Sequence, residues 1–343
     1  MTRTVLAGVA LLAAAAASGI VAPAPARAKP YVFALVPKAT NNPFYDLARD
    51  GCKKAEAESK GAFECLYIGP SEHGGGDEQV QIVEDLVVKH VDGIAVSPAN
   101  APAMAKALQA AKKAGIPVLT WDSDVLPKDH DLRIAYIGTH NYDIGVDLAN
   151  RTMQLKPHGG TVCIQTGGAA AENLNERTQG IRDTLSGQKS SEPPGDRLTG
   201  QNGWTEVDGC PLYTNDDFPL ALQQMEDILN KYPKLDAFVP NAGFPQFGGA
   251  QAYRRVVQKI KPRLQDGSLA LVIGDSLPMQ VELMKEGLSD GQVGQKPFDM
   301  GYDVMEGFYA IKQGKPAPKD PTYTGLTDCT PKNADTCLSG GPS

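Results

Sequence analysis

Carboxylate side chains follow two of the apolar runs in this sequence, at points where strands are expected to end. Asp122 follows Val118–Trp121, and Asp275 comes two residues after Leu269–Ile273. A carboxylate makes strong hydrogen bonds to hydroxyl groups. Two carboxylates that face one another can also act as acid and base in glycoside hydrolysis. The sequence therefore indicates a binding site for a hydroxylated solute, or alternatively a secreted carbohydrate-active enzyme that uses this pair.

The apolar run Tyr31–Val36 leads into a similar polar turn. Asn42 closes that turn, Pro43 suits the first turn of a helix, and Phe44 and Tyr45 come next. A short run rich in β-formers predicts a strand buried on both faces. Ligands bind at the carboxyl ends of such parallel strands. The alternative is that the aromatics only pack in the core and the asparagine only closes the turn.

Strands and helices alternate along the chain in two successive series. Helices are expected from Asp46, after an N-cap at Asp77, up to Ala111, and over 171–185, 220–229 and 300–312. Residues 186–204 are rich in Gly, Pro and Ser and predict a surface loop. This alternation predicts an α/β protein with doubly wound parallel sheets. The expected strands are 31–36, 63–68, 91–96, 118–121, 134–137, 161–165, one within 206–214, 237–241 and 269–273, and residues 293–295 are expected to form the last crossover.

Composition limits the class of function. The 343 residues carry a formal net charge of −7 with no basic cluster, which argues against nucleic-acid binding. Gly74, Gly75 and Gly76 lack the Lys-Ser/Thr of a phosphate-binding loop. A zinc site is the rival use of the cysteines, but no CxxC occurs and the histidines are scattered. We therefore expect neither a cofactor nor a metal.

Residues 1–28 have the pattern of a cleavable signal peptide. Arg3 precedes an apolar stretch over 5–21, and Ala26-Arg27-Ala28 is a typical cleavage site. A retained membrane anchor is the alternative interpretation. No other apolar stretch reaches the about 20 residues of a membrane span. We expect an exported, periplasmic protein.

Six cysteines suit an oxidising compartment. They allow many pairings, and cysteines that are neighbours along the chain are expected to join. The expected disulfides are Cys52 with Cys65, Cys163 with Cys210, and Cys329 with Cys337.

Several motifs recur in the order found in one known family. The segment Lys38–Tyr45, Lys-Ala-Thr-Asn-Asn-Pro-Phe-Tyr, resembles the opening motif of periplasmic sugar-binding proteins of ABC importers, of the ribose/galactose-binding type. Asp92–Pro98, Gly115–Val118, Gly138–Gly145 and Glu176–Ile181 resemble further motifs of that type.

The resemblance implies two lobes joined by a three-strand hinge. It implies an N-terminal lobe of 29–138 plus 296–322, and a C-terminal lobe with tail of 139–295 plus 323–343. The chain would cross between them near Gly138, Gln295 and Tyr323. It also implies a ligand-binding set in the cleft: Lys38, Asn42, Phe44, Tyr45, Ser97, Asp122, Arg177, Asn241, Asp275 and Gln295.

One position departs from the family. The aromatic that stacks on the far face of the sugar is replaced by Asp216, so Phe218, Phe244 or Phe247 would have to supply that ring, or the face is polar.

The resemblance implies a monomeric, non-enzymatic solute-binding protein that captures a monosaccharide or small polyol. Its partner would be an ABC permease. The alternative is a receptor module for a furanone-type autoinducer or for a chemoreceptor.

Overall fold

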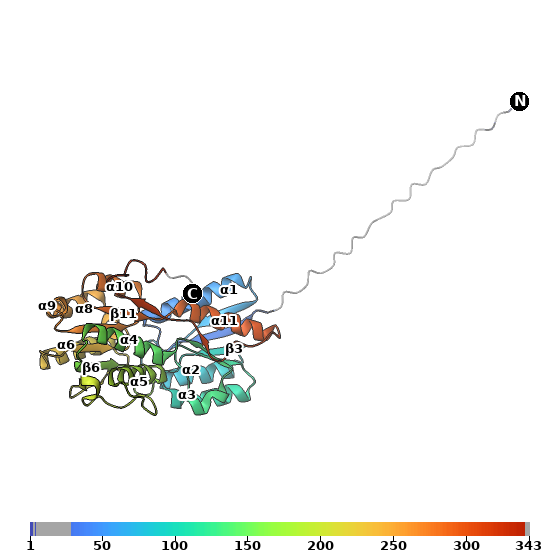
Figure 1. Ribbon diagram of the computed structural model, residues 1–343. Helices are drawn as coiled ribbons and strands as arrows, with labels where there is room; N and C mark the ends of the chain where they lie inside the picture. Colours follow the sequence, from blue (N-terminus) through green and yellow to red (C-terminus); the bar gives the residue numbers. More distant parts are fainter. Residues whose placement is uncertain (3, 5–28, 340–343) are drawn as a thin grey trace.

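The computed structural model describes residues 1, 2, 4 and 29–339, which are coloured in Figure 1. The predicted signal peptide, residues 1–28, lies outside the described residues apart from 1, 2 and 4. Residues 29–339 form two α/β units that lie side by side (Figure 1). None of the described helices has the length and apolar character needed to cross a membrane.

The first unit is built on a six-stranded sheet in which every neighbouring pair is parallel. Its order is β12-β5-β4-β3-β1-β2. The strands are β1 (Tyr31–Val36), β2 (Phe63–Tyr67), β3 (Gly93–Val96), β4 (Val118–Trp121), β5 (Ala135–Gly138) and β12 (Thr322–Tyr323).

The second unit repeats this plan with the order β13-β11-β10-β9-β6-β7, and β8 also pairs with β6. Only β13 runs antiparallel to its neighbour, β11, among the described pairs. The strands are β6 (Gly160–Thr166), β7 (Trp204–Glu206), β8 (Leu212–Tyr213), β9 (Ala237–Pro240), β10 (Ala270–Gly274), β11 (Gly291–Gly294) and β13 (Thr327–Cys329).

Helices cover both faces of each sheet. In the first unit they are α1 (Pro43–Glu58), α2 (Asp77–Val88), α3 (Ala101–Lys113), α11 (Pro297–Lys312) and the 3-10 turn η1 (Pro127–Leu132). In the second unit they are α4 (Asn141–Leu155), α5 (Glu172–Ser186), α6 (Phe218–Lys231), α7 (Phe244–Phe247), α8 (Ala250–Val257), α9 (Lys261–Gln265), α10 (Pro278–Lys285) and the 3-10 turn η2 (Gln201–Gly203).

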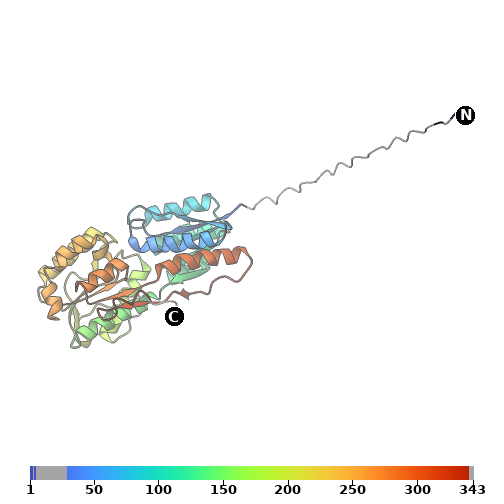
Figure 2. The same ribbon diagram turned by 90° about the horizontal axis from the view of Figure 1, so that it is seen from above.

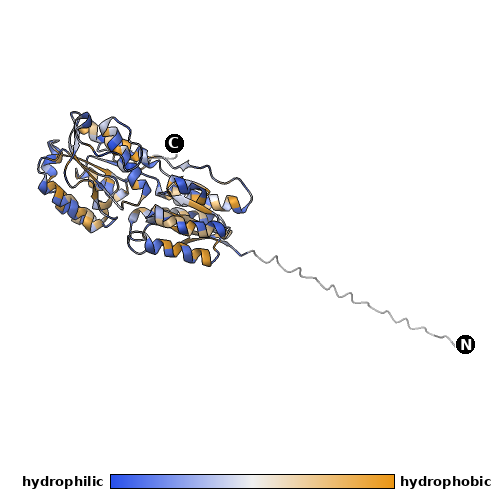
Figure 3. Ribbon diagram, turned by 90° about the horizontal axis from the view of Figure 1, so that it is seen from below, coloured by the Kyte–Doolittle hydropathy of each residue, from blue (hydrophilic) through white to orange (hydrophobic). Residues whose placement is uncertain are grey.

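Alternation along the strands builds a separate core on each face. In β1, Phe33 and Leu35 face α1 and α11, while Ala34 and Val36 face α2 and α3. In Figure 3 the strands are largely hydrophobic, and the helices that cover them carry both hydrophobic and hydrophilic residues. Burial on both faces explains why the strands appear in the sequence as continuous apolar runs.

The chain passes three times between the units. It leaves the first sheet between β5 and α4, returns between β11 and α11, and crosses again between β12 and β13. The returning helix α11 packs beside α1, as Figure 2 shows. The predicted fold class, two doubly wound sheets with a three-strand connection, is confirmed.

Four local features differ from what the sequence analysis expected. Residues 141–155, which the sequence analysis left unassigned, form α4, and the expected strand within 206–214 is divided between β7 and β8. Asp77 does not cap α2, because Gly76 is the N-cap residue and makes no side-chain cap. The loop predicted over 186–204 ends in β7 and buries Leu198, so part of it belongs to the core.

The cysteines form three disulfides, Cys52–Cys65, Cys163–Cys210 and Cys329–Cys337. The first ties α1 to β2, and the second ties β6 to the segment before β8. The third closes the C-terminal segment that carries β13.

Helices α4 and α5 approach closely at two glycines. A Cβ atom at Gly145 would lie 2.1 Å from the carbonyl oxygen of Arg177, and one at Gly180 would lie 2.2 Å from that of Tyr142. Real Cβ atoms do not come this near to backbone oxygen. The position of α5, and of the side chains it carries, therefore depends on these missing methyl groups.

We predict that Gly145→Ala destabilises the protein by about 1–3 kcal/mol, because overpacking must push the two helices apart. Urea unfolding measures the change. The control is Gly74→Ala, where a Cβ meets nothing within 4 Å and the change should stay within about 0.5 kcal/mol. Equal stability of both variants would contradict the close approach.

Candidate functional site

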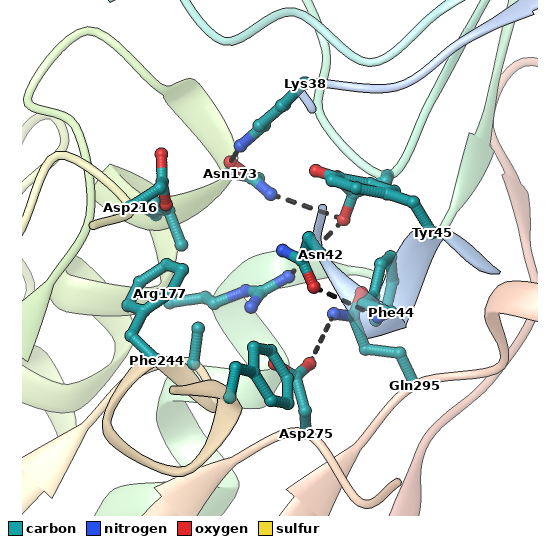
Figure 4. A pocket seen from close by; sticks show the side chains of 14 residues that line it. Lys38, Asn42, Phe44, Tyr45, Asn173, Arg177, Asp216, Phe244, Asp275 and Gln295 are labelled. Atoms are coloured by element: carbon teal, nitrogen blue, oxygen red, sulfur yellow. Dashed lines mark hydrogen bonds and ion pairs between the residues drawn. The ribbon is translucent and has the colours of Figure 1, made fainter. Parts of the chain in front are cut away.

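A small cavity lies between the two units, at the carboxyl ends of their strands (Figure 4). Its volume is about 20 Å³, which is room for about one water molecule. Both units line it, with polar, charged and aromatic side chains. The lining residues are Lys38, Asn42, Phe44, Tyr45, Asp122, Asn173, Leu174, Arg177, Asp216, Ala242, Phe244, Phe247, Asp275 and Gln295.

Most of the residues predicted for the site reach this cavity. Two do not: Ser97 and Asn241 are absent from its lining, although both are fully buried beside it. Their side chains are instead committed to other residues of the site, as described below. The structure also adds members that the predicted set lacked: Asn173, Leu174, Asp216, Ala242, Phe244 and Phe247.

The start of α1 places one wall. Asn42 caps the helix, because its Oδ1 accepts a hydrogen bond from the Phe44 N–H at 3.0 Å. The Oδ1 atom of Asn42 therefore has the structural role that the alternative interpretation gave this residue. Asn42 nevertheless also lines the cavity. Tyr45 packs edge-on against Trp121, with ring centroids 5.5 Å apart. The aromatic pair holds Tyr45 in place.

Asp122 receives hydrogen bonds from the first unit on one carboxylate oxygen. Its Oδ2 accepts from the Tyr45 hydroxyl at 3.0 Å and from the Ser97 hydroxyl at 2.7 Å. Burial and the charge of Asp122 raise the pKa of Tyr45 well above its usual value, so this hydroxyl stays protonated and donates. Ser97 thus orients Asp122 from behind.

The other oxygen of Asp122 faces the second unit. Its Oδ1 lies 3.4 Å from the Asn173 amide nitrogen, which donates to it, and 3.8 Å from Arg177 Nη2. Lys38 reaches the same place, because its Nζ donates to Asn173 Oδ1 at 2.7 Å. Burial lowers the pKa of Lys38, although the nearby carboxylates of Asp122 and Asp216 oppose this. Asn173 therefore bridges a lysine and a carboxylate across the cleft.

Arg177 is fixed at two of its three guanidinium nitrogens. Nε donates to Asn141 Oδ1 at 2.9 Å, and Nη1 donates to the carbonyl oxygen of Asn241 at 3.2 Å. Nη2 is buried and has no hydrogen-bond partner among residues 29–339. The Asn241 amide nitrogen in turn donates to three oxygens of the second unit: Thr166 Oγ1, the Leu174 carbonyl and Thr178 Oγ1. Asn241 is thus a support for α5 and Arg177.

Asp275 and Gln295 form another side of the cavity. Asp275 follows β10, and Gln295 lies at the second crossing. Asp275 Oδ2 accepts from the Gly243 N–H at 2.9 Å, and Oδ1 accepts from Gln295 Nε2 at 3.0 Å. The Gln295 Oε1 atom is buried and accepts no hydrogen bond in the described part of the chain. Burial raises the pKa of Asp275, and these two hydrogen bonds and Arg177 oppose the shift.

Asp216, which the sequence analysis expected in place of an aromatic ring, lines the cavity. Its Oδ2 lies 3.5 Å from His73 Nδ1, on the facing unit. Phe244 and Phe247 line the cavity, whereas Phe218 does not. Phe218 packs behind them, stacked on Phe244 at 6.4 Å and edge-on to Phe247 at 5.7 Å between centroids. Of the three expected candidates, two present aromatic surface to the cavity.

The three carboxylates that line the cavity share an uncommon backbone conformation. Asp122, Asp216 and Asp275 have φ values of 59°, 60° and 67°. Left-handed backbone is rare for residues other than glycine, and aspartate and asparagine tolerate it best. Such strain gathers at functional sites because the surroundings hold it there. Each of the three residues follows the end of a strand, β4, β8 or β10, and lines the cavity.

Direct contacts close the cleft around the cavity. Besides the Lys38–Asn173 bond, the backbone N–H of Ala101 in the first unit donates to the carbonyl oxygen of Ala170 in the second at 3.0 Å. A cavity with room for about one water cannot admit a larger solute in this form. A solute can enter only if the two units separate.

Among the lining residues that the sequence analysis did not predict, Asn173 could have been recognised from its spacing to Arg177. It lies four positions before Arg177 on α5, so the two side chains share a helix face. Asp216, Phe244 and Phe247 were weighed only as departures from the family.

The sequence and the structure match known proteins over most of the chain. Residues 33–316 match the family described as the periplasmic binding protein domain. The D-allose-binding periplasmic protein of Escherichia coli K12 is 26% identical over 301 residues, which cover 84% of this chain and 87% of that protein. The D-ribose/D-allose-binding protein of Pseudomonas aeruginosa is 26% identical over 255 residues, covering 68% of this chain and 73% of that protein.

Among solved structures, an ABC transporter solute-binding protein from Burkholderia graminis in complex with D-arabinose superimposes with a TM-score of 0.74. It is 31% identical, and the match covers 89% of this chain and 97% of that one. In the described part of this chain, no group of three or more His, Cys, Asp or Glu side chains is arranged to hold a metal ion.

The raised pKa of Asp275 predicts a pH effect on stability. The folded protein binds this proton more tightly than the unfolded chain does. The stabilisation from Asp275 is therefore present below its unfolded pKa of about 3.8 and is lost as pH rises through the folded pKa. We predict that Asp275→Asn gains stability relative to wild type as pH rises from about 3.8.

Denaturant unfolding of both proteins at several pH values measures this difference. Asp266→Asn is the control of opposite sign, because hydrogen bonds from Ser268 lower the pKa of Asp266. Its stability relative to wild type should fall over the same rise in pH. A difference for Asp275→Asn that does not change with pH would refute the prediction.

Proposed function

This chain belongs to the periplasmic binding protein domain family, and on this premise we propose that it is the solute-binding component of an ABC importer and captures a monosaccharide or small polyol. The family consists of non-enzymatic solute-binding proteins, so a hydrolase built on Asp122 and Asp275 is no longer a candidate. The relatives described above bind ribose, allose or arabinose according to their names.

The observation that carries the proposal is a pair of unpartnered polar atoms among fixed carboxylates. Arg177 Nη2 is a donor and Gln295 Oε1 is an acceptor, and both belong to residues that line the cavity. Leaving such groups unpaired costs about 1–3 kcal/mol each. A hydroxyl group both donates and accepts, so neighbouring hydroxyls of one sugar would satisfy both atoms and also bond to Asp122 and Asp275.

The aromatic side chains complete this chemistry. Phe44 and Tyr45 lie on the first unit, and Phe244 and Phe247 lie on the second. A sugar ring presents C–H groups on its faces, and aromatic rings bury such surface well. The polar Asp216 beside these rings favours a ligand with an additional hydroxyl directed toward the second unit.

Closure follows from this division of contacts. We take the lobes to be 29–138 plus 296–322, and 139–295 plus 323–343, rotating about the three crossings. A solute that contacts Asp122 on one lobe and Arg177 on the other binds the closed form better than the open form. It therefore shifts the population toward closure by this difference in affinity.

The wider setting is part of the proposal. Residues 1–28 would direct export and be removed, and the mature chain would act in the periplasm as a monomer. The closed form would then dock on its membrane permease and release the solute there. This part rests on the signal-peptide pattern and on the relatives named above.

A thermal-shift screen against monosaccharides and polyols tests the function. The panel should contain D-ribose, D-allose, D-arabinose, other pentoses and hexoses, and inositols. A cognate ligand at a hundred times its Kd stabilises by about 2.7 kcal/mol. X-ray scattering with that ligand should then show compaction relative to an open, ligand-free form. No stabilisation by any member of the panel would refute the proposed ligand class.

We predict that Arg177→Ala and Asp122→Ala each lower the affinity for the cognate ligand more than tenfold, or more than about 1.4 kcal/mol. Each removes a charged partner of the ligand hydroxyls. Calorimetric titration measures the affinity, and circular dichroism checks that the variants fold. The matched control is Arg254→Ala, which removes an exposed guanidinium paired with Glu286. Unchanged affinity in both site variants would remove these residues from the site.

A further inference from the structure

A second and larger cavity lies beside the crossings between the units. Its volume is about 240 Å³, more than ten times the about 15 Å³ that admits one water. Asp124 and Tyr136 line it from the first unit, Glu172 and Glu176 from α5, and Tyr323 from β12. The proposed sugar site makes no use of these residues.

Two side chains form a wall between this cavity and the sugar site. The Asn141 amide nitrogen donates to the Asp122 carbonyl oxygen at 3.2 Å and to the Tyr136 hydroxyl oxygen at 3.1 Å. On its other side, Asn141 Oδ1 accepts from Arg177 Nε. Asn141 and Tyr136 line the larger cavity, whereas Arg177 and Asp122 line the smaller one. The two cavities are therefore adjacent but distinct.

The larger cavity has more acidic than basic groups. Arg133 is the only lysine or arginine in its lining, and it already serves two carboxylates. Its Nε and Nη2 donate to Asp124 at 3.1 and 2.7 Å, and its Nη1 pairs with Asp320. Glu172 and Glu176 make no ion pair with a basic side chain among the described residues. Two carboxyl groups are thus left without a countercharge.

These two carboxyls lie one turn apart on α5, and Glu172 acts on the pKa of Glu176. Burial, Glu172 and Asp124 raise the pKa of Glu176 to about 8, opposed by Arg177 and by a hydrogen bond from Asn141. Burial and Asp124 also raise the pKa of Glu172. The remaining titratable groups of the lining are Arg133, His130, His140, Asp320, Tyr136 and Tyr323.

One carboxyl group in the lining of this cavity also lacks a hydrogen-bond partner among the described residues. Glu172 is 9% exposed and no hydrogen bond to its carboxyl is present in the described structure. Buried polar groups normally have partners. An acceptor-rich cavity with unmet hydrogen bonds is suited to a ligand that donates.

Aromatic surface and an entrance complete the setting. His140 packs edge-on against Tyr323, with ring centroids 5.1 Å apart, and Tyr323 is 51% exposed at the rim. Tyr136 lies inside and is buried. Aromatic faces attract organic cations. The cavity therefore offers both carboxyl oxygens and ring faces to a positively charged group.

We propose that this cavity is a second binding site and that it takes a small organic ammonium ion, such as a linear diamine, at Glu172 and Glu176. One ammonium group lies between the two carboxylates, and the alkyl chain extends along the tyrosines. When the ligand binds, protonated Glu176 loses its proton to the buffer and becomes the carboxylate partner of the ammonium. The amine itself keeps its charge, because alkylamines have pKa values near about 10.

Such a ligand would be coupled to the sugar site. The cavity is lined by both units, and Tyr323 in its lining ends β12, directly before the third crossing. A cation held there favours the arrangement in which these parts are close together, which is also the arrangement that closes the sugar cavity. Each ligand would then raise the affinity for the other by the same factor.

The test is calorimetric titration of the purified protein with 1,4-diaminobutane in the absence of sugar, so that its outcome does not depend on the proposed function. The neutral 1,4-butanediol and Mg²⁺ at matched ionic strength serve as ligand controls. We expect saturable binding of the diamine alone, with affinity that rises between pH 6 and about 8. Titrations in buffers of different ionisation enthalpy should reveal proton release.

Variants assign the site. Glu176→Gln and Glu172→Gln should each weaken diamine binding at least about tenfold, and Glu176→Gln should also abolish the proton release. Glu78→Gln, at an exposed carboxyl on α2, should leave both unchanged. If Glu176→Gln fails to fold, the proposal is judged from the diamine affinity of Glu172→Gln and from the proton release of the wild type. No saturable binding, equal binding of butanediol, or unchanged affinity in the glutamine variants would overturn the proposal.

Discussion

One buried carboxylate connects the two units of this protein. Asp122 accepts hydrogen bonds from Tyr45 and Ser97 of its own unit through one oxygen, and it faces Asn173 and Arg177 of the other unit through the second. A buried charge is costly unless it is fully hydrogen-bonded. The closed arrangement is therefore favoured only while both sets of partners are in place. A solute that donates further hydrogen bonds to this carboxylate would also stabilise the closed arrangement.

The placement of the second set of partners depends on backbone packing. Asn173 and Arg177 both lie on α5, and α5 lies against α4 only because Gly145 and Gly180 carry no side chain. Asn241 adds hydrogen bonds between β9 and α5 from below. The position of Arg177 is thus set by main-chain contacts and by a side-chain amide, neither of which lines the cavity.

The sequence was most informative where strands end. Apolar runs buried on both faces are easy to recognise, and the polar residue after each run must lie at one edge of the sheet, which located Asp122 and Asp275. The sequence could not say which way a polar side chain points: Ser97 and Asn241 turn away to support Asp122 and α5. The aromatic replacements were also ambiguous, because Phe244 and Phe247 lie on α7, which is remote in sequence from Asp216.

The left-handed backbone at Asp122, Asp216 and Asp275 limits how this cleft can evolve. Few residue types tolerate that conformation, and asparagine is the one nearest in shape to aspartate. Exchanging carboxylate for amide at these positions would therefore preserve the main chain while converting an acceptor into a group that also donates. We expect that related proteins which bind other solutes exchange aspartate for asparagine at these positions. We expect longer side chains to be selected against there.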